Sequence, residues 1–139
     1  MNTTDATELN EAFHALTLPK AEWTHEAHLT VCWYALQTMT STRAVPYLRQ
    51  AIRAYNKATG TPNTDTSGYH ETLTRYYVTA VESLGASKPD TIHTAAECSR
   101  TAPLKHWTHK LLFSTQARKQ CVQPDLEPLP WHPTERSPR

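Results

Sequence analysis

Hydrophobic residues recur at helical spacing in four stretches of the chain, and these stretches predict four longer helices. They cover about residues 5–16, 24–39, 42–59 and 68–84. In the third stretch the apolar residues are three or four positions apart, so they share one helix face: Val45, Leu48, Ile52 and Tyr55. The corresponding face of the first stretch carries Leu9, Ala12, Phe13 and Leu16.

Capping residues and glycines indicate where these helices begin and end. Thr24 is expected to cap the second helix and Ser67 the fourth, because their hydroxyl groups can accept a hydrogen bond from an unpaired amide of the first turn. Gly60 and Gly85 are expected to end the third and fourth helices. Three shorter helices are expected at about residues 90–98, 103–109 and 115–120, the last of them capped by Ser114.

The C-terminal segment is expected to be extended, because five prolines follow Val122. We expect Leu126, Leu129 and Trp131 to lie on the helical body and residues 132–139 to form a flexible tail. No pair of strands is indicated. The sequence therefore predicts a single all-α domain over residues 1–139, ordered from about 5 to 131. It is a bundle of about four longer helices with short helices and a proline-rich tail.

Composition and charge exclude several partners. The chain has 139 residues and a formal charge of +1, without a basic run, so we expect no nucleic-acid partner. It has no long apolar run, so we expect no membrane span. The three cysteines are scattered and lack a Cys-x-x-Cys spacing, which favours a reducing, cytoplasmic compartment. A small-molecule partner remains, and a homodimer is left open.

Histidines stand where core residues are expected at the start of the second helix. At about 100° per residue, His25 and His28 fall on the face that carries Leu29, Cys32 and Leu36. Their i, i+3 spacing places the two Cβ atoms about 5–6 Å apart. Both rings can therefore reach one ion.

His70 holds a similar place on the fourth helix. It falls on the face that carries Leu73, Tyr77 and Val81. The two histidine-bearing helix ends would meet if the helices packed in parallel, or if the third helix returned the chain to the same end of the bundle. The sequence therefore predicts that His25, His28 and His70 converge inside the bundle.

Three converging imidazoles favour a metal ion. An unpaired buried polar group costs about 1–3 kcal/mol, and a divalent ion satisfies three ring nitrogens at once. Three protein ligands leave a coordination position open, as catalytic sites do. We therefore expect one divalent transition-metal ion, which is iron, copper or zinc, since imidazole binds all three.

Residues around His70 are candidates for the chemistry. Glu71 lies about 100° from His70 on the helix, so it suits a general base or a group that orients a ligand. A first-turn charge favoured by the helix dipole is the alternative role for Glu71. Tyr69 and Tyr77 are candidate hydrogen-bond donors in catalysis, with packing the alternative for Tyr77, and Thr74 is a candidate substrate contact.

Two further positions are left open. Cys32 is interpreted as a small core residue, with a sulfur ligand not excluded. His106 and His109 repeat the i, i+3 spacing on either side of Trp107, and His106 is a candidate substrate contact.

Five motifs resemble those of a family of small, mostly uncharacterised bacterial helical proteins. They are W-T-H-x-x-H-L from Trp23, I-R-x-Y-N-x-x-x-G from Ile52, N-T-x-x-x-G-Y-H-E-T-x-T from Asn63, L-F-S-x-x-A-R from Leu112 and P-D-L-x-P-L-P from Pro124. The resemblance implies that the functional set consists of His25, His28, His70 and Glu71. It also implies supporting roles for Asn56, Asn63, Tyr69 and Thr74, with Asn63 a candidate substrate contact. It implies no particular reaction.

The function expected from these features is that of a small metalloenzyme. Its three-histidine site would act on a small organic molecule, by redox or oxygen chemistry, with a metal-dependent hydrolase or lyase as the second enzymatic interpretation. The alternative is a non-catalytic module that binds a small ligand, or a structural metal ion with Glu71 or Cys32 as a fourth ligand. In a third interpretation no metal is bound, and the histidines form a polar pocket for an acidic small molecule.

Overall fold

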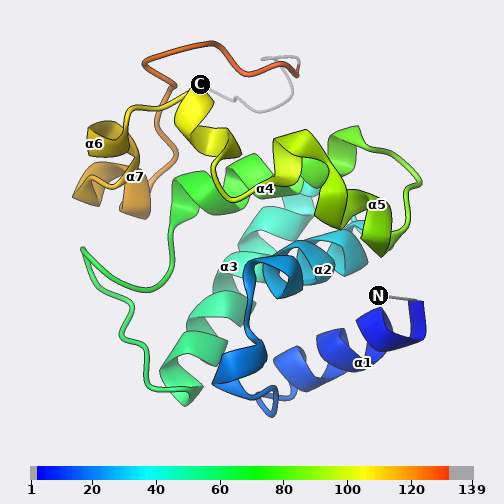
Figure 1. The fold of residues 1–139 in the computed structure, drawn as a ribbon. Helices are drawn as coiled ribbons and strands as arrows, with labels where there is room; N and C mark the ends of the chain where they lie inside the picture. The colour runs from blue at the N-terminus through cyan, green and yellow to red at the C-terminus, as the bar shows by residue number, and fades with distance from the viewer. Residues whose placement is uncertain (1–2, 132–139) are drawn as a thin grey trace.

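The described part of the chain, residues 3–131 of a computed structural model, consists of seven α-helices and three short 3-10 helices (Figure 1). Residues 3–131 contain no strand, so the predicted all-α class is confirmed. None of their helices combines the length and the apolar character needed to cross a membrane. The four longer helices are α1 (Thr3–His14), α2 (His25–Leu36), α3 (Ser41–Ala58) and α4 (Glu71–Ser83). The short elements are η1 (Lys20–Glu22), α5 (Pro89–Thr94), η2 (Ala96–Cys98), η3 (Ala102–Lys105), α6 (His109–Leu112) and α7 (Thr115–Lys119).

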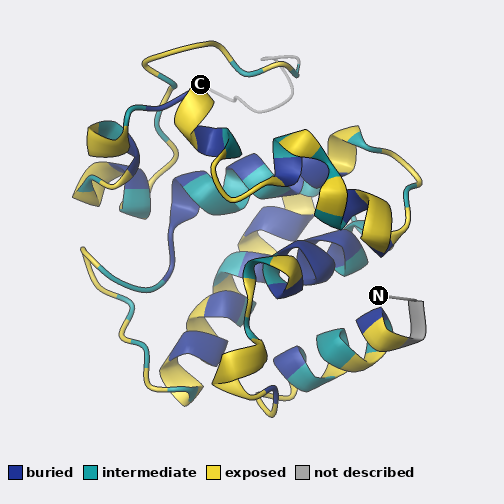
Figure 2. Ribbon diagram, in the orientation of Figure 1, coloured by how far each residue is buried: buried dark blue, intermediate teal, exposed yellow. Residues whose placement is uncertain are grey.

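Helix α2 lies at the centre of the fold and contacts α1, α3, α4 and α5. Figure 2 shows that most of its length is buried. The sequence predicted one buried face for this helix, but apolar and small side chains on several of its sides are covered by neighbouring helices. The predicted buried face of α2 was therefore too narrow. Its buried residues are Ala27, Leu29, Thr30, Val31, Cys32, Trp33 and Ala35.

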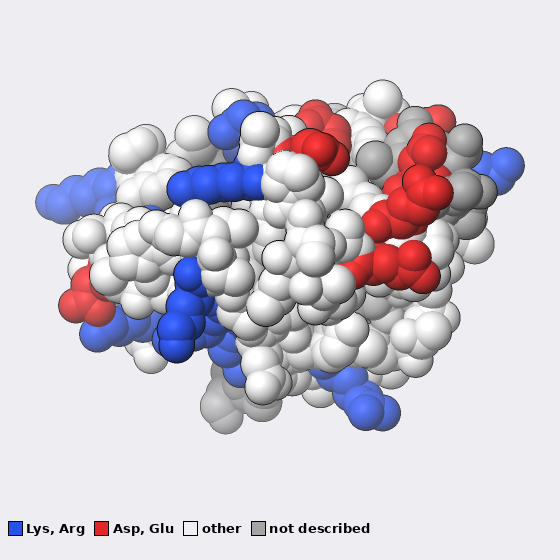
Figure 3. Space-filling model, turned by 90° about the horizontal axis from the view of Figure 1, so that it is seen from below, with Lys and Arg blue, Asp and Glu red and all other residues white. Residues whose placement is uncertain are grey.

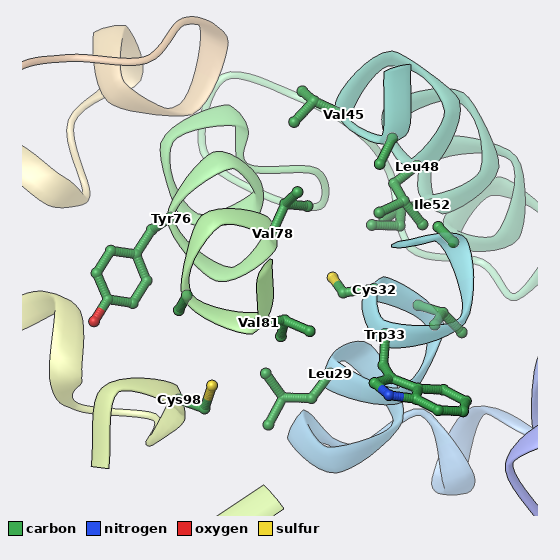
Figure 4. Packing of buried hydrophobic residues seen from close by; sticks show 14 of the residues in the cluster. Leu29, Cys32, Trp33, Val45, Leu48, Ile52, Tyr76, Val78, Val81 and Cys98 are labelled. Atoms are coloured by element: carbon green, nitrogen blue, oxygen red, sulfur yellow. The ribbon is translucent and has the colours of Figure 1, made fainter. Parts of the chain in front are cut away.

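The core forms where α2, α3 and α4 meet. Figure 4 shows Leu29 and Cys32 of α2 near Val78 and Val81 of α4. Each fully buried aliphatic side chain of this kind stabilises the fold by about 1.5–3 kcal/mol. Cys32 is a core residue, as expected. The predicted face of α3 is confirmed, since Val45, Leu48, Ile52 and Tyr55 are all buried.

Several predicted helix ends are confirmed by their hydrogen bonds. The Thr24 hydroxyl accepts from the Ala27 amide at 3.2 Å, and the Ser114 hydroxyl accepts from the Ala117 amide at 3.1 Å. The first helix ends earlier than expected. Leu16 lies beyond it with φ of 64°, and its side chain is 44% exposed instead of buried.

The expected start of the fourth helix is wrong: α4 begins at Glu71, and its cap is His70 in place of Ser67. Gly68 has φ of +83°, which is left-handed backbone that breaks a helix. A Cβ atom there would lie 2.5 Å from the Pro62 carbonyl oxygen, so the preceding loop closes tightly on Gly68. This loop, residues 61–70, carries the chain from α3 to α4.

The C-terminal third differs from expectation in detail. The helix expected at 90–98 is split into α5 and η2, and the helix expected at 103–109 is replaced by η3, with α6 beginning after Thr108. Leu129 and Trp131 pack against the core as expected, whereas Leu126 is 51% exposed, so its predicted packing is wrong. The tail predicted at 132–139 lies outside the described residues.

Candidate functional site

His25, at the first position of α2, is bound to the backbone of a neighbouring segment. Its Nε2 donates to the carbonyl oxygen of Cys98 at 2.7 Å, and its ring packs edge-on against Tyr77 with 5.0 Å between centroids. Because a carbonyl oxygen only accepts, Nε2 carries a proton in this contact.

His28 is held within its own helix turn. Its Nδ1 donates to the Thr24 carbonyl oxygen at 3.0 Å, and its ring lies on that of Trp23 with 3.8 Å between centroids. Burial lowers the pKa of His28 from 6.5 to about 4. This imidazole is therefore neutral at pH 7.

His70 acts as the N-cap of α4, with both ring nitrogens engaged. Its Nδ1 accepts from the Leu73 amide at 3.2 Å, and its Nε2 donates to the Leu112 carbonyl oxygen at 2.6 Å. The residue is buried, and burial lowers its pKa. An imidazole with these two partners already satisfies its buried nitrogens without a metal ion.

The structure does not bring the three histidines together. His25 packs on Tyr77, which follows His70 by about 10 Å along the axis of α4. Within residues 3–131, no group of three or more histidine, cysteine, aspartate or glutamate side chains is placed to hold a metal ion. The expected convergence fails because α2 and α4 pack with their N-terminal ends staggered. The expected face of α4 was also incomplete, since Thr72, Tyr76 and Val78 are buried as well. The bound metal ion stays a prediction.

The buried carboxylate of Glu71 forms a hydrogen-bonded ion pair with the partly exposed side chain of Arg49. Arg49 donates to its two carboxylate oxygens through Nε at 2.9 Å and Nη2 at 2.8 Å, and the Tyr69 hydroxyl donates at 2.8 Å. Burial would raise the pKa of Glu71, but the bonds from Arg49 and Tyr69 outweigh it and hold the pKa low. A carboxylate in this state is a weak general base at neutral pH. Glu71 thus binds Arg49 and Tyr69, not a histidine ring.

The remaining candidates also have structural contacts. The Tyr77 hydroxyl donates to the Ser99 carbonyl oxygen at 2.7 Å, which fastens α4 to the chain after η2. This contact favours the packing role for Tyr77. Thr74 hydrogen-bonds the Tyr69 hydroxyl through its side chain. His106 donates from Nδ1 to the Glu127 carbonyl oxygen at 2.9 Å, so it anchors the C-terminal segment.

Asn63 organises the loop before α4. Its Oδ1 accepts from Asn56 Nδ2 and from the Tyr69 amide, both at 3.1 Å, and its Nδ2 donates to the Arg53 carbonyl oxygen at 3.0 Å. The supporting roles implied for Asn56 and Asn63 thus have a physical counterpart. These bonds fix the loop against α3, and the loop forms one wall of a cavity.

This cavity has a volume of about 300 Å³ and lies beside the Arg49–Glu71 ion pair. Residues from α3, α4, α7 and the loop before α4 line it. Its ionic side chains are five cations and two carboxylates: Arg49, Arg53, Arg75, Arg118 and Lys119, with Asp65 and Glu71. We call it the arginine pocket.

Both carboxylates of the arginine pocket are already paired. Lys119 lies 3.1 Å from Asp65, and Arg49 holds Glu71. Arg118 donates from Nη1 to the carbonyl oxygens of Gly68 and Tyr69 at 2.9 and 3.3 Å, and its buried Nε has no hydrogen-bond partner in the described structure. Arg53 and Arg118 form no ion pair within the described residues, so these two guanidinium groups leave the pocket with an excess of positive charge.

This pocket was not predicted from the sequence. A signal was present in α3, where Arg49, Arg53 and Lys57 repeat every four residues and share one helix face. The formal charge of only +1 for the whole chain concealed it. Arg118, which lines the pocket with Arg49 and Arg53 from α7, could not be placed without the fold.

Comparison of the chain with family models, with curated proteins and with solved structures finds no match. The resemblance drawn from the five motifs therefore stays a prediction.

Proposed function

We propose that this protein binds a small anionic molecule, through a carboxylate or phosphate group, in the arginine pocket. One observation carries the proposal. Five cationic side chains and only two carboxylates surround a cavity of about 300 Å³, and each carboxylate is already held by one of the cations. An anion in the cavity would replace the missing negative charge.

The guanidinium groups suit this chemistry. A guanidinium offers planar, paired donors that match the oxygens of a carboxylate or phosphate, and such charge-assisted hydrogen bonds are about twice as strong as neutral ones. Arg49 uses Nε and Nη2 for Glu71, so Nη1 is left outside that pair. The side chain of Arg53 forms neither a hydrogen bond nor an ion pair within the described residues, and it can bind a ligand without losing a contact.

The pocket is also held in shape before a ligand arrives. Tyr69 and Arg49 bind the buried carboxylate of Glu71, and Asn63 fixes the adjoining loop. A guanidinium that is already ordered loses less side-chain entropy on binding. A volume of about 300 Å³ lies at the small end of the range for ligand sites, which favours a small molecule.

The metal-dependent oxidoreductase expected from the histidines has less support. His70 would have to give up its cap or its bond to Leu112 to bind an ion. Elemental analysis of untagged protein tests that prediction, and stoichiometric iron, copper or zinc lost on His25→Ala would support it.

The experiment for anion binding is calorimetric titration with inorganic phosphate at low ionic strength and pH 7.5. We expect Arg53→Gln to weaken binding about tenfold, because it removes a hydrogen bond between two charged groups. Arg43→Gln is the matched control, since Arg43 is exposed on the same helix but does not line the pocket. Equal affinities for the two variants, or no binding by the parent protein, would overturn the proposal.

A further inference from the structure

We infer that the natural ligand is a linear oligophosphate or a similar elongated oligoanion, whose second anionic group is held by Lys57 outside the arginine pocket. This inference rests on the proposed function and extends it from a single anionic group to a ligand with several.

A second hollow adjoins the arginine pocket at the C-terminal end of α3. It has a volume of about 690 Å³ and is lined by Arg53, Lys57, Asn63 and the turn at residues 60–62. Arg53 and Asn63 line both hollows, so the two are neighbours across these side chains. A ligand that overfills the first can extend into the second.

The second hollow is positively charged as well. No carboxylate lines it, and the side chains of Arg53 and Lys57 form no hydrogen bond or ion pair within residues 3–131. Arg49, Arg53 and Lys57 follow one another by a helix turn, with about 6 Å between successive Cα positions along the axis. Three cations in such a row match a chain of anionic groups better than one compact anion.

The charge is local to this side of the protein. The two hollows together carry six cationic side chains and two carboxylates, whereas the whole chain has a formal charge of only +1. The rest of the sequence therefore carries a net negative formal charge. Figure 3 shows a face of the molecule on which most acidic side chains gather at one side and most basic ones lie at the other. Such a separation of charge steers an oligoanion towards the basic side.

The helix dipole offers a simpler explanation of Lys57, because a cation in the last turn of a helix is favourable by itself. The same dipole opposes an anion near the end of α3. However, the Tyr55, Asn56 and Lys57 carbonyl oxygens there accept from the amides of residues 59–61, which reduces their exposed charge. The two explanations differ in what removal of Lys57 does to ligand affinity.

The test is calorimetric titration of the full chain with phosphate and with linear tripolyphosphate, at the same ionic strength. We expect tripolyphosphate to bind at least about tenfold more tightly, because it adds charged contacts. Lys57→Gln should weaken tripolyphosphate binding about threefold to fivefold, the effect of one exposed ionic contact, and leave phosphate binding unchanged. Arg43→Gln should change neither.

An unchanged tripolyphosphate affinity in Lys57→Gln would overturn the inference. So would an equal loss of affinity for phosphate and tripolyphosphate, because Lys57 would then act only through its long-range electrostatic field. These outcomes are distinct from failure of the proposed function. In that case phosphate does not bind the parent protein, or Arg53→Gln and Arg43→Gln behave alike. Lys57 is exposed, so its replacement leaves the fold intact, and an unchanged melting temperature checks this.

Discussion

Replacing His70 tests whether this residue is a structural cap. His70→Ala removes the acceptor for the Leu73 amide, and loss of an N-cap costs about 1 kcal/mol. It also leaves the Leu112 carbonyl oxygen without its donor, which costs about 1–3 kcal/mol at a buried site. The free energy of unfolding should therefore fall by about 2–4 kcal/mol, a large part of the stability of a typical domain.

His70→Asn separates the two contributions. Asparagine is among the best N-cap residues, so this variant should recover about 1 kcal/mol of the loss through the Leu73 amide. It cannot reach Leu112 as imidazole does. The order of stability should be parent, His70→Asn, then His70→Ala.

Urea unfolding followed by circular dichroism measures these differences, and thermal melts check them at roughly 3–4 °C per kcal/mol for a chain of this size. A stability of His70→Ala within 0.5 kcal/mol of the parent would refute the capping role. So would an asparagine variant no more stable than the alanine one. If both variants kept full stability but lost a bound metal ion, His70 would be a ligand after all.

Three further outcomes are expected. In urea unfolding, Gly68→Ala should lower the free energy of unfolding by more than about 2 kcal/mol, because the new Cβ atom would lie 2.5 Å from a backbone oxygen. Gly60 also has a positive φ but has open space around it, so Gly60→Ala should lower it by only about 1 kcal/mol. Equal losses in the two variants would contradict the close approach at Gly68. Burial lowers the pKa of His28 from 6.5 to about 4, so the unfolded chain takes up a proton at a higher pH than the folded protein does. The free energy of unfolding should therefore be highest above pH 6.5 and fall by up to about 3 kcal/mol as the pH drops towards 4. His28→Gln should remove this pH dependence, and a dependence that persists in the variant would belong to other groups. Glu71→Gln should lower the free energy of unfolding by about 2 kcal/mol, because Arg49 loses its charged partner. The same variant should bind phosphate several-fold more tightly in calorimetry, because the charge of Arg49 is no longer neutralised. Weaker phosphate binding would mean that Glu71 positions Arg49 for the anion.

Local features of the fold were predictable because they depend on neighbouring residues. The Thr24 and Ser114 caps follow from side chains that reach the next turn, and the buried face of α3 follows from helical spacing. The start of α4 was misjudged because Ser67 is a good cap by type, whereas the actual cap is an imidazole. The start of α4 at Glu71 depends on the close approach of Gly68 to the preceding loop.

The candidate site was predictable only in part, because it depends on how helices pack. Helical geometry placed His25 and His28 correctly on one helix, but nothing in the spacing determines the stagger between α2 and α4. That stagger brings His25 to Tyr77 and leaves His70 apart. The arginine pocket was missed for the same reason, since Arg118 reaches the loop before α4 from a helix far along the chain.

The rate at which Cys121 reacts with a maleimide reagent tests the anion-binding proposal most directly. Cys121 is exposed and lines the arginine pocket, whereas Cys32 and Cys98 are buried, so labelling reports on the pocket. Saturating phosphate should slow the labelling of Cys121 relative to chloride at the same ionic strength and pH. This protection should persist in Arg43→Gln and fall in Arg53→Gln. Equal labelling rates in phosphate and chloride would contradict an anion site in this pocket.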